Sequence, residues 1–132
     1  MTLAIGVDVG GTKVAAGVVD EDGRIIAKLK RSTPAASPAR TEQAIADAVT
    51  ELSASHRVAA IGLGAAGFVD SARATMLFAP NLAWRDEPLK QRVEERLGRE
   101  VVVENDANAS AWAEARFGAA RGHRDAMLVA LG

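Results

Sequence analysis

The amino-terminal stretch that sets the architecture, residues 3–23, reads LAIGVDVGGTKVAAGVVDEDG. Apolar residues alternate with smaller ones up to Val9, and a second apolar run follows the Gly-Gly pair at 10–11. This pattern predicts two strands joined by a tight turn. Another turn signal, Asp-Glu-Asp-Gly at 20–23, precedes a third predicted strand over 24–31. The amino end therefore predicts an antiparallel meander, and not a strand–helix–strand unit.

Helices and strands alternate through the rest of the chain. Ser37 followed by Pro38 is typical of a helix start, Gly98 is typical of a helix end, and residues 64–86 are predicted to be irregular. Three strands followed by this alternation predict an α/β fold with a mixed sheet and helices on its faces. The predicted elements are a helix from Ser37 to Leu52, a strand over 58–63, a helix capped by Asp86 with Pro88 in its first turn and running through Leu97, a strand over 101–104, a helix from Asn105 to about Phe117, and a strand over 126–131.

Composition excludes several classes of protein. The chain has 132 residues, a net charge of −1, 48% apolar and 25% charged residues, which suits one globular domain or lobe. Near-neutral charge argues against a nucleic-acid partner, and the absence of cysteine excludes disulfides and cysteine-based zinc sites within the chain. No apolar run reaches about 18 residues, and the amino end lacks a basic region typical of signal peptides. A cytoplasmic protein without membrane contact is expected.

The glycine turn (residues 10–12, Gly-Gly-Thr) is the first candidate site. A Walker A loop requires Lys and then Ser or Thr before a helix, whereas here Thr12 precedes Lys13 and a strand follows. Glycines nevertheless let backbone N–H groups approach phosphate oxygens, and the Thr12 hydroxyl adds a donor. Asp8 can hold Mg²⁺ through water. The plainer interpretation is an ordinary hairpin turn with a solvated Asp8.

Two further segments each allow a plainer explanation. The G-x-G-x-x-G spacing at 62–67 follows a predicted strand, but no helical period follows it, which argues against a dinucleotide site. A ligand-facing loop and simple close packing both stay open. Asn81 lies in an otherwise apolar loop, where it can bind a sugar hydroxyl above Trp84, or serve a turn beside a core tryptophan.

The END motif (residues 104–106, Glu-Asn-Asp) stands where a predicted strand meets a predicted helix. Asp106 can act there simply as a helix N-cap. One cap needs one polar side chain, however, and Asn108 enlarges the cluster. A carboxylate at the carboxyl edge of a sheet is well placed to accept a proton from a substrate hydroxyl.

Together, three segments resemble the bacterial sugar kinases of the ROK type, and most of all the glucokinases among them: IGVDVGGTK (5–13), FAPNLAWRDEPLK (78–90) and VVVENDANASAWAEARFG (101–118). The resemblance implies the actin-like ATPase fold, also called ribonuclease H-like, with a five-stranded mixed sheet in the order βββαβαβα. It divides the chain into a small lobe over 1–118 and, over 119–132, a linker with the first strand of a second lobe.

The resemblance also implies roles for single residues. Asp106 is the implied catalytic base, and Mg²⁺ is implied beside Asp8. The implied phosphate-binding residues for ATP are Gly10, Gly11, Thr12 and Lys13. The implied sugar-binding residues are Gly64, Ala65, Gly67, Asn81, Asn105 and Asp106.

The implied reaction is ATP-dependent phosphorylation of glucose at its 6-hydroxyl, a phosphotransfer to an alcohol. Family kinases are much longer than this chain, and their remaining part carries a second phosphate loop, the adenosine site and a zinc motif. The chain is therefore expected to be inactive alone, with zinc only in that remaining part, and the full-length protein is expected to be a homo-oligomer. Kinases for another hexose or an N-acetylhexosamine, and a non-catalytic sugar-binding lobe, stay open as alternatives. A DNA-binding repressor is disfavoured because the first strand begins at Leu3.

Overall fold

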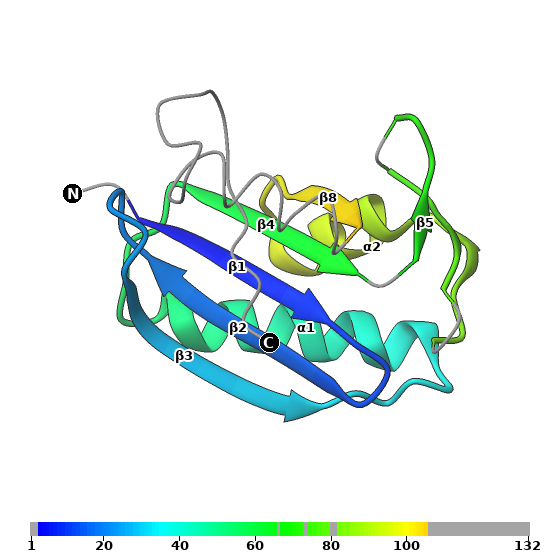
Figure 1. The fold of residues 1–132 in the computed structure, drawn as a ribbon, viewed down its shortest axis with the longest axis horizontal. Helices are drawn as coiled ribbons and strands as arrows, with labels where there is room; N and C mark the ends of the chain where they lie inside the picture. Colours follow the sequence, from blue (N-terminus) through cyan, green and yellow to red (C-terminus); the bar gives the residue numbers. More distant parts are fainter. Residues whose placement is uncertain (1–2, 66, 73, 80–81, 106–132) are drawn as a thin grey trace.

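The computed structural model describes residues 3–65, 67–72, 74–79 and 82–105. Its central sheet contains β1 (Ala4–Val9), β2 (Lys13–Val19), β3 (Ile25–Ser32), β4 (Ala60–Ala65) and β8 (Val102–Asn105). These five strands lie in the order β3-β2-β1-β4-β8 (Figure 1). Neighbours in the β1–β2–β3 meander are antiparallel, whereas β1, β4 and β8 run parallel. The mixed sheet and the meander confirm the fold predicted from the sequence.

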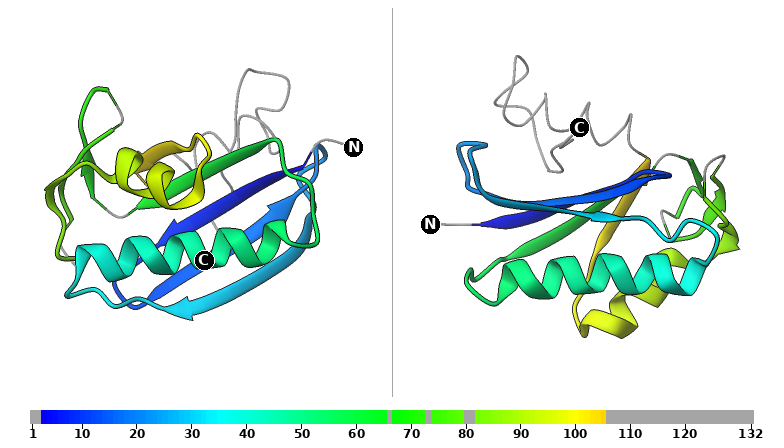
Figure 2. Two further views of the ribbon diagram at one scale, coloured as in Figure 1. Left: turned by 180° about the vertical axis from the view of Figure 1, so that it is seen from behind. Right: turned by 90° about the horizontal axis from the view of Figure 1, so that it is seen from below.

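Both described helices, α1 (Pro38–Ser53) and α2 (Leu89–Leu97), lie on the same face of this sheet (Figure 2). As predicted, Ser37 caps α1: its Oγ accepts a hydrogen bond from the Arg40 N–H at 3.2 Å. Gly98 ends α2 with a φ of 69°, in the left-handed region that favours glycine. Neither helix, in the part of the chain that the structure describes, is long and apolar enough to cross a membrane.

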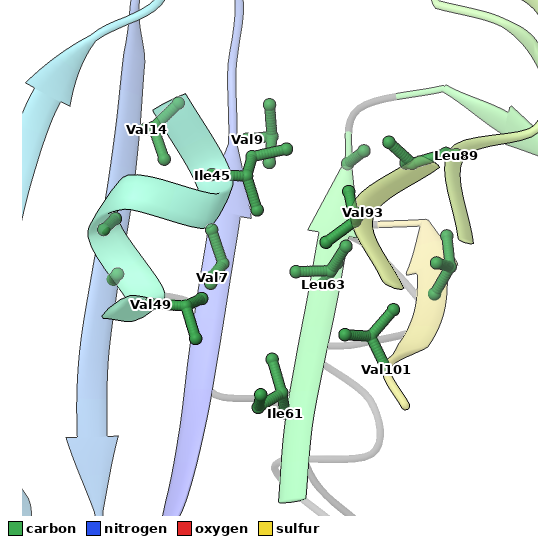
Figure 3. Packing of buried hydrophobic residues seen from close by; sticks show 14 of the residues in the cluster. Val7, Val9, Val14, Ile45, Val49, Ile61, Leu63, Leu89, Val93 and Val101 are labelled. Carbon is green, nitrogen blue, oxygen red and sulfur yellow. The ribbon is translucent and has the colours of Figure 1, made fainter. Parts of the chain in front are cut away.

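The apolar core lies between the sheet and these helices (Figure 3). Val7 and Val9 of β1 are fully buried beside Ile45 of α1, and Leu63 of β4 is fully buried near Val93 of α2. Each such side chain contributes roughly 1.5–3 kcal/mol of burial free energy. Since alternate residues of a strand point to opposite faces, this packing directs the side chain between Val7 and Val9 to the other face of the sheet.

A second sheet was not predicted. It has the order β5-β6-β7, formed by β5 (Phe68–Val69), β6 (Met76–Phe78) and β7 (Arg85–Glu87). The expectation that 64–86 is irregular is therefore wrong. Strands of two or three residues are too short to show a period-2 pattern in sequence, and their antiparallel pairing supplies the order instead. The Asp70 carboxylate closes the β5–β6 turn by accepting from the N–H groups of Ala74 and Thr75.

Several predicted boundaries need correction. Asp86 does not cap α2: it lies within β7 with a φ of 50°, and the helix begins after Pro88 without a side-chain cap. The strand predicted over 58–63 runs two residues later, as β4. The predicted helix over 105–117, the strand over 126–131 and the lobe boundary at 118 all lie outside the described residues.

Candidate functional site

The carboxyl ends of the three parallel strands bring the two main motifs to one edge of the sheet. Val9 of β1 pairs with Ala65 of β4, which pairs in turn with Asn105 of β8. The glycine turn begins immediately after Val9, and Asp106 follows Asn105 in the chain. Adjacent strands lie about 4.8 Å apart, so these two motifs start within about 10 Å of one another. Ligands of α/β sheets bind at such carboxyl edges.

The backbone of the glycine turn is held from two sides. Gly10 donates its N–H to the Lys13 carbonyl at 2.9 Å, which closes the turn. The carbonyl of Gly10 accepts from the Thr33 hydroxyl, and the carbonyl of Thr12 accepts from the Thr33 N–H, each at 2.9 Å. Among the described residues, the N–H groups of Gly11 and Thr12 have no backbone partner. Because β2 follows the turn where a Walker A loop needs a helix, the turn is not a P-loop.

Gly10 is not required by the fold. A Cβ atom built there would lie 3.5 Å from the Lys13 carbonyl oxygen, an ordinary van der Waals contact. The positive φ values among the described glycines belong to Gly23 and Gly98, not to Gly10. Glycine at this position is therefore better explained by the close approach of a ligand to the backbone than by the conformation of the turn.

Asp8 is half-buried and, because it alternates with Val7 and Val9, faces away from the helices. It pairs with Ala15 of β2 and with Gly64 of β4, which pairs in turn with Glu104 of β8, so the β4 position beside Asp8 carries no side chain. Mg²⁺ keeps several of its waters and is bound through one or two carboxylates, and Asp8 supplies one carboxylate. No group of three or more metal-ligating side chains occurs in the described ranges, so any Mg²⁺ there would also need water and phosphate ligands.

The second glycine motif is part of β4 and its exit. Gly62 and Gly64 lie within β4, and Gly67 leads into β5, a strand. A dinucleotide site needs a helix at that point, so the dinucleotide interpretation is excluded. The Ala65 side chain is completely buried in the core, and only its backbone remains for contact with a ligand.

Asn81 lies outside the described residues, but the segments on both sides of it are well anchored. Ala79 and Trp84 are fully buried, which makes Trp84 a core residue and not a platform beneath a ligand. The Arg85 guanidinium donates to the carbonyls of Ala79, Leu82 and Trp84 at 3.2, 3.0 and 2.7 Å. Arg85 and Thr33 are the two residues near the candidate site that the sequence analysis missed, and neither belongs to a pattern that would have indicated it.

The END motif closes β8. Glu104 is buried, with 4% of its surface exposed, and lies in register with Gly64 and Asp8. Asn105 is the last residue of the strand, and Asp106 lies outside the described residues. Two predicted site residues, Asn81 and Asp106, are thus located only through their neighbours in the chain.

Two carboxyl groups with shifted pKa values, Glu42 and Glu94, take part in the packing of the helices. Burial raises the pKa of Glu42 on α1 to about 8, and the hydrogen bond and negative charge of Glu87 add to that rise against the opposing charges of Arg96 and Arg92. Burial alone would also raise the pKa of Glu94, but hydrogen bonds from Lys90 and the Val101 N–H lower it below its usual value.

Comparison with known proteins identifies the family. The family model described as the ROK family matches residues 4–132. The chain belongs to the ROK family. This agrees with the mixed sheet described above, which has the architecture of ROK sugar kinases and of the actin-like ATPase fold.

Named ROK relatives are longer than this chain. The glucokinase of Streptomyces coelicolor is 54% identical over 132 residues, which are 100% of this chain and 41% of that protein. A ROK family glucokinase from Streptomyces griseus, crystallised with glucose and AMPPNP, has a TM-score of 0.83 at 60% identity over 92% of this chain and 38% of that one. The ROK hexokinase from Thermus thermophilus has a TM-score of 0.81 at 41% identity, over 92% and 41% of the two chains. The chain thus spans about two fifths of the length of its ROK relatives.

Proposed function

We propose that this chain is the amino-terminal lobe of an ATP-dependent glucokinase, which transfers the γ-phosphoryl group of ATP to the 6-hydroxyl of glucose. The observation that carries the proposal is the register of Val9, Ala65 and Asn105, since it sets the glycine turn and the END motif at one edge of the sheet. The glucose and AMPPNP bound by the Streptomyces griseus relative, 60% identical, support the same two ligands here.

In this mechanism, residues of this chain bind the phosphates and the sugar, orient them, and remove the proton from the glucose 6-hydroxyl. The N–H groups of Gly11 and Thr12 hold phosphate oxygens, and Lys13 at the start of β2 adds positive charge beside them. Asp106 accepts the proton of the glucose 6-hydroxyl as that oxygen attacks the γ-phosphorus in line. Mg²⁺, held through water at Asp8, would neutralise charge on the phosphates.

The sugar is held on the other side of the reacting oxygen. The amide side chains of Asn81 and Asn105 donate hydrogen bonds to its hydroxyls and accept hydrogen bonds from them. The backbone from Gly64 to Gly67 lies behind the ring. The backbone of this last stretch suits the role because Gly64 has no side chain and Ala65 directs its own into the core. We place the small lobe at 1–118 and a linker with the first strand of a second lobe at 119–132. A cytoplasmic, homo-oligomeric kinase is the corresponding whole protein.

Fusion of the chain to the remaining part of the Streptomyces coelicolor glucokinase tests this proposal. The chain would replace the region that it matches in that enzyme. We expect glucose-dependent formation of ADP, with mannose and N-acetylglucosamine assayed in parallel to identify the preferred sugar. A correctly folded fusion that phosphorylates none of these sugars, while the unmodified Streptomyces enzyme is active, would overturn the proposal.

Asp106→Asn in the same fusion tests the base. We expect turnover to fall by about 10²–10⁴-fold, because general base catalysis contributes that much, while glucose still binds. Turnover is measured by a coupled ADP assay, and glucose affinity by calorimetry. Asp47→Asn, which changes an exposed acid on α1, is the matched control and should retain full activity. Near-normal turnover by Asp106→Asn would remove Asp106 from its role.

A further inference from the structure

Thr33 contacts the glycine turn twice, although it lies 21 residues beyond Thr12 in the chain. Its N–H donates to the carbonyl of Thr12, and its hydroxyl donates to the carbonyl of Gly10, each at 2.9 Å. The N–H contact extends the β2–β3 ladder by one residue beyond the Lys13–Ser32 pair. The hydroxyl contact has no such origin, because it joins a side chain to a residue outside either strand.

The hydroxyl contact determines where the next N–H group points. In a planar trans peptide the C=O and N–H bonds point in opposite directions. The peptide that joins Gly10 to Gly11 directs its carbonyl toward Thr33, so the Gly11 N–H points away from Thr33. This is one of the two N–H groups of the turn that have no backbone partner among the described residues. Neither glycine has a side chain to hold this peptide, and the Thr33 hydroxyl supplies that restraint.

Thr33 is itself held in place by the segment that follows it. The carbonyl of Pro34 accepts from the Thr41 hydroxyl at 3.0 Å, and the carbonyl of Ala35 accepts from the Ala83 N–H at 2.9 Å. The 33–35 segment therefore joins the glycine turn to α1 and to the loop that carries Asn81. A rigid support of this kind is what an oriented donor needs.

We propose that Thr33 is a positioning residue for ATP: its hydroxyl orients the Gly11 N–H toward the bound phosphates. The inference rests on the proposed function, since it assumes that the glycine turn binds the nucleotide. Thr33 itself touches no phosphate in this arrangement and acts through the Gly10–Gly11 peptide.

Thr33→Val and Thr33→Ser in the fusion protein test the proposal. Valine keeps the shape but removes the hydroxyl, and one lost hydrogen bond of about 0.5–1.5 kcal/mol corresponds to a rise of about 2- to 12-fold in the KM for ATP. In Thr33→Val we expect this rise while the KM for glucose stays unchanged. In Thr33→Ser, which keeps the hydroxyl, we expect the KM for ATP to return to its original value. Thr50→Val is the matched control, because it makes the same substitution at an exposed position of α1 outside the 33–35 segment and the turn. It should leave the KM for ATP unchanged.

A nuclear magnetic resonance titration of the fusion protein separates this inference from the kinase proposal. Addition of AMPPNP should shift the Gly11 amide resonance in the unmodified fusion and in Thr33→Ser, but much less in Thr33→Val. If the fusion lacks kinase activity and this pattern is still seen, the kinase proposal fails and the role of Thr33 stands. The inference would be overturned if Thr33→Val altered neither the KM for ATP nor the Gly11 shift. It would also be overturned if the KM for glucose rose as much as the KM for ATP.

Discussion

At the residue scale, Gly10 combines a closed turn with room for a side chain. We expect Gly10→Ala to leave the free energy of unfolding within about 1 kcal/mol of its original value, because the added methyl group meets only an ordinary contact. In the fusion protein the same methyl group should raise the KM for ATP by about tenfold or more, since the backbone can no longer approach a phosphate as closely. Urea unfolding and steady-state kinetics measure the two effects.

The two measurements on Gly10→Ala have to be compared with each other. A large loss of stability would show that the fold itself needs glycine at this position. A normal KM for ATP in a stable variant would show that no phosphate approaches Gly10. Gly98→Ala is a useful reference, because it has open space but a left-handed φ, and strain alone should cost it about 1 kcal/mol.

At the scale of elements, a buried carboxyl group joins α1 to β7 and α2. Glu42 has 1% of its surface exposed and lies against Glu87, with Arg96 Nη2 4.0 Å from Glu42 Oε1 and Arg92 Nε 3.9 Å from Glu87 Oε2. Two carboxyl groups this close favour sharing a proton, and burial penalises the charged form further. The packing of α1 on α2 therefore depends on the protonation of Glu42.

This arrangement predicts a pH dependence of stability. The pKa of Glu42 rises from 4.5 in the unfolded chain to about 8 in the folded one, so the folded chain holds a proton that the unfolded chain releases. The contribution of Glu42 to the free energy of unfolding should be largest below pH 4.5. It should fall as the pH rises toward 8 and then level off. Glutamine has no such proton, so Glu42→Gln should become more stable than the original chain by about 1–3 kcal/mol near pH 8.

Urea unfolding at several pH values between 5 and 8 measures this difference. Glu51→Gln is the control, because Glu51 lies exposed on the same helix and forms an ion pair with Arg31 at 2.6 Å. Such a surface pair contributes about 0–1 kcal/mol, and its removal should give a profile parallel to that of the original chain. If Glu42→Gln also runs parallel to the original chain, the proton-sharing interpretation is wrong.

At the scale of the whole molecule, the chain spans about two fifths of its relatives and holds one edge of the proposed site. We expect the 132-residue chain alone to bind glucose weakly and to form no glucose 6-phosphate, because the resemblance assigns the adenosine site to the part of the family beyond this match. Calorimetry with glucose and a coupled assay on the chain alone check this. Turnover by the chain alone would show that these residues contain a complete active site.

Much of the central sheet could be predicted because its signals are local. Alternating apolar residues identify β1, and turn chemistry at Asp20 and Gly23 identifies the hairpin that follows β2. The Ser37 cap of α1 depends on its near neighbours alone. The three short strands β5, β6 and β7 could not be predicted, since pairing between segments distant in sequence, and not local pattern, makes them strands.

The candidate site divides in the same way. The residue types of the glycine turn and of the END motif are visible in sequence because phosphate binding and proton transfer each need particular chemical groups. Their adjacency depends on the parallel pairing of β1, β4 and β8, and the contacts of Thr33 and Glu42 depend on how distant segments pack. Sequence alone therefore determined the local elements and the candidate chemistry, since both follow from neighbouring residues. Tertiary structure alone decided which groups meet, because contacts between distant residues form only once the sheet register and helix packing bring them together.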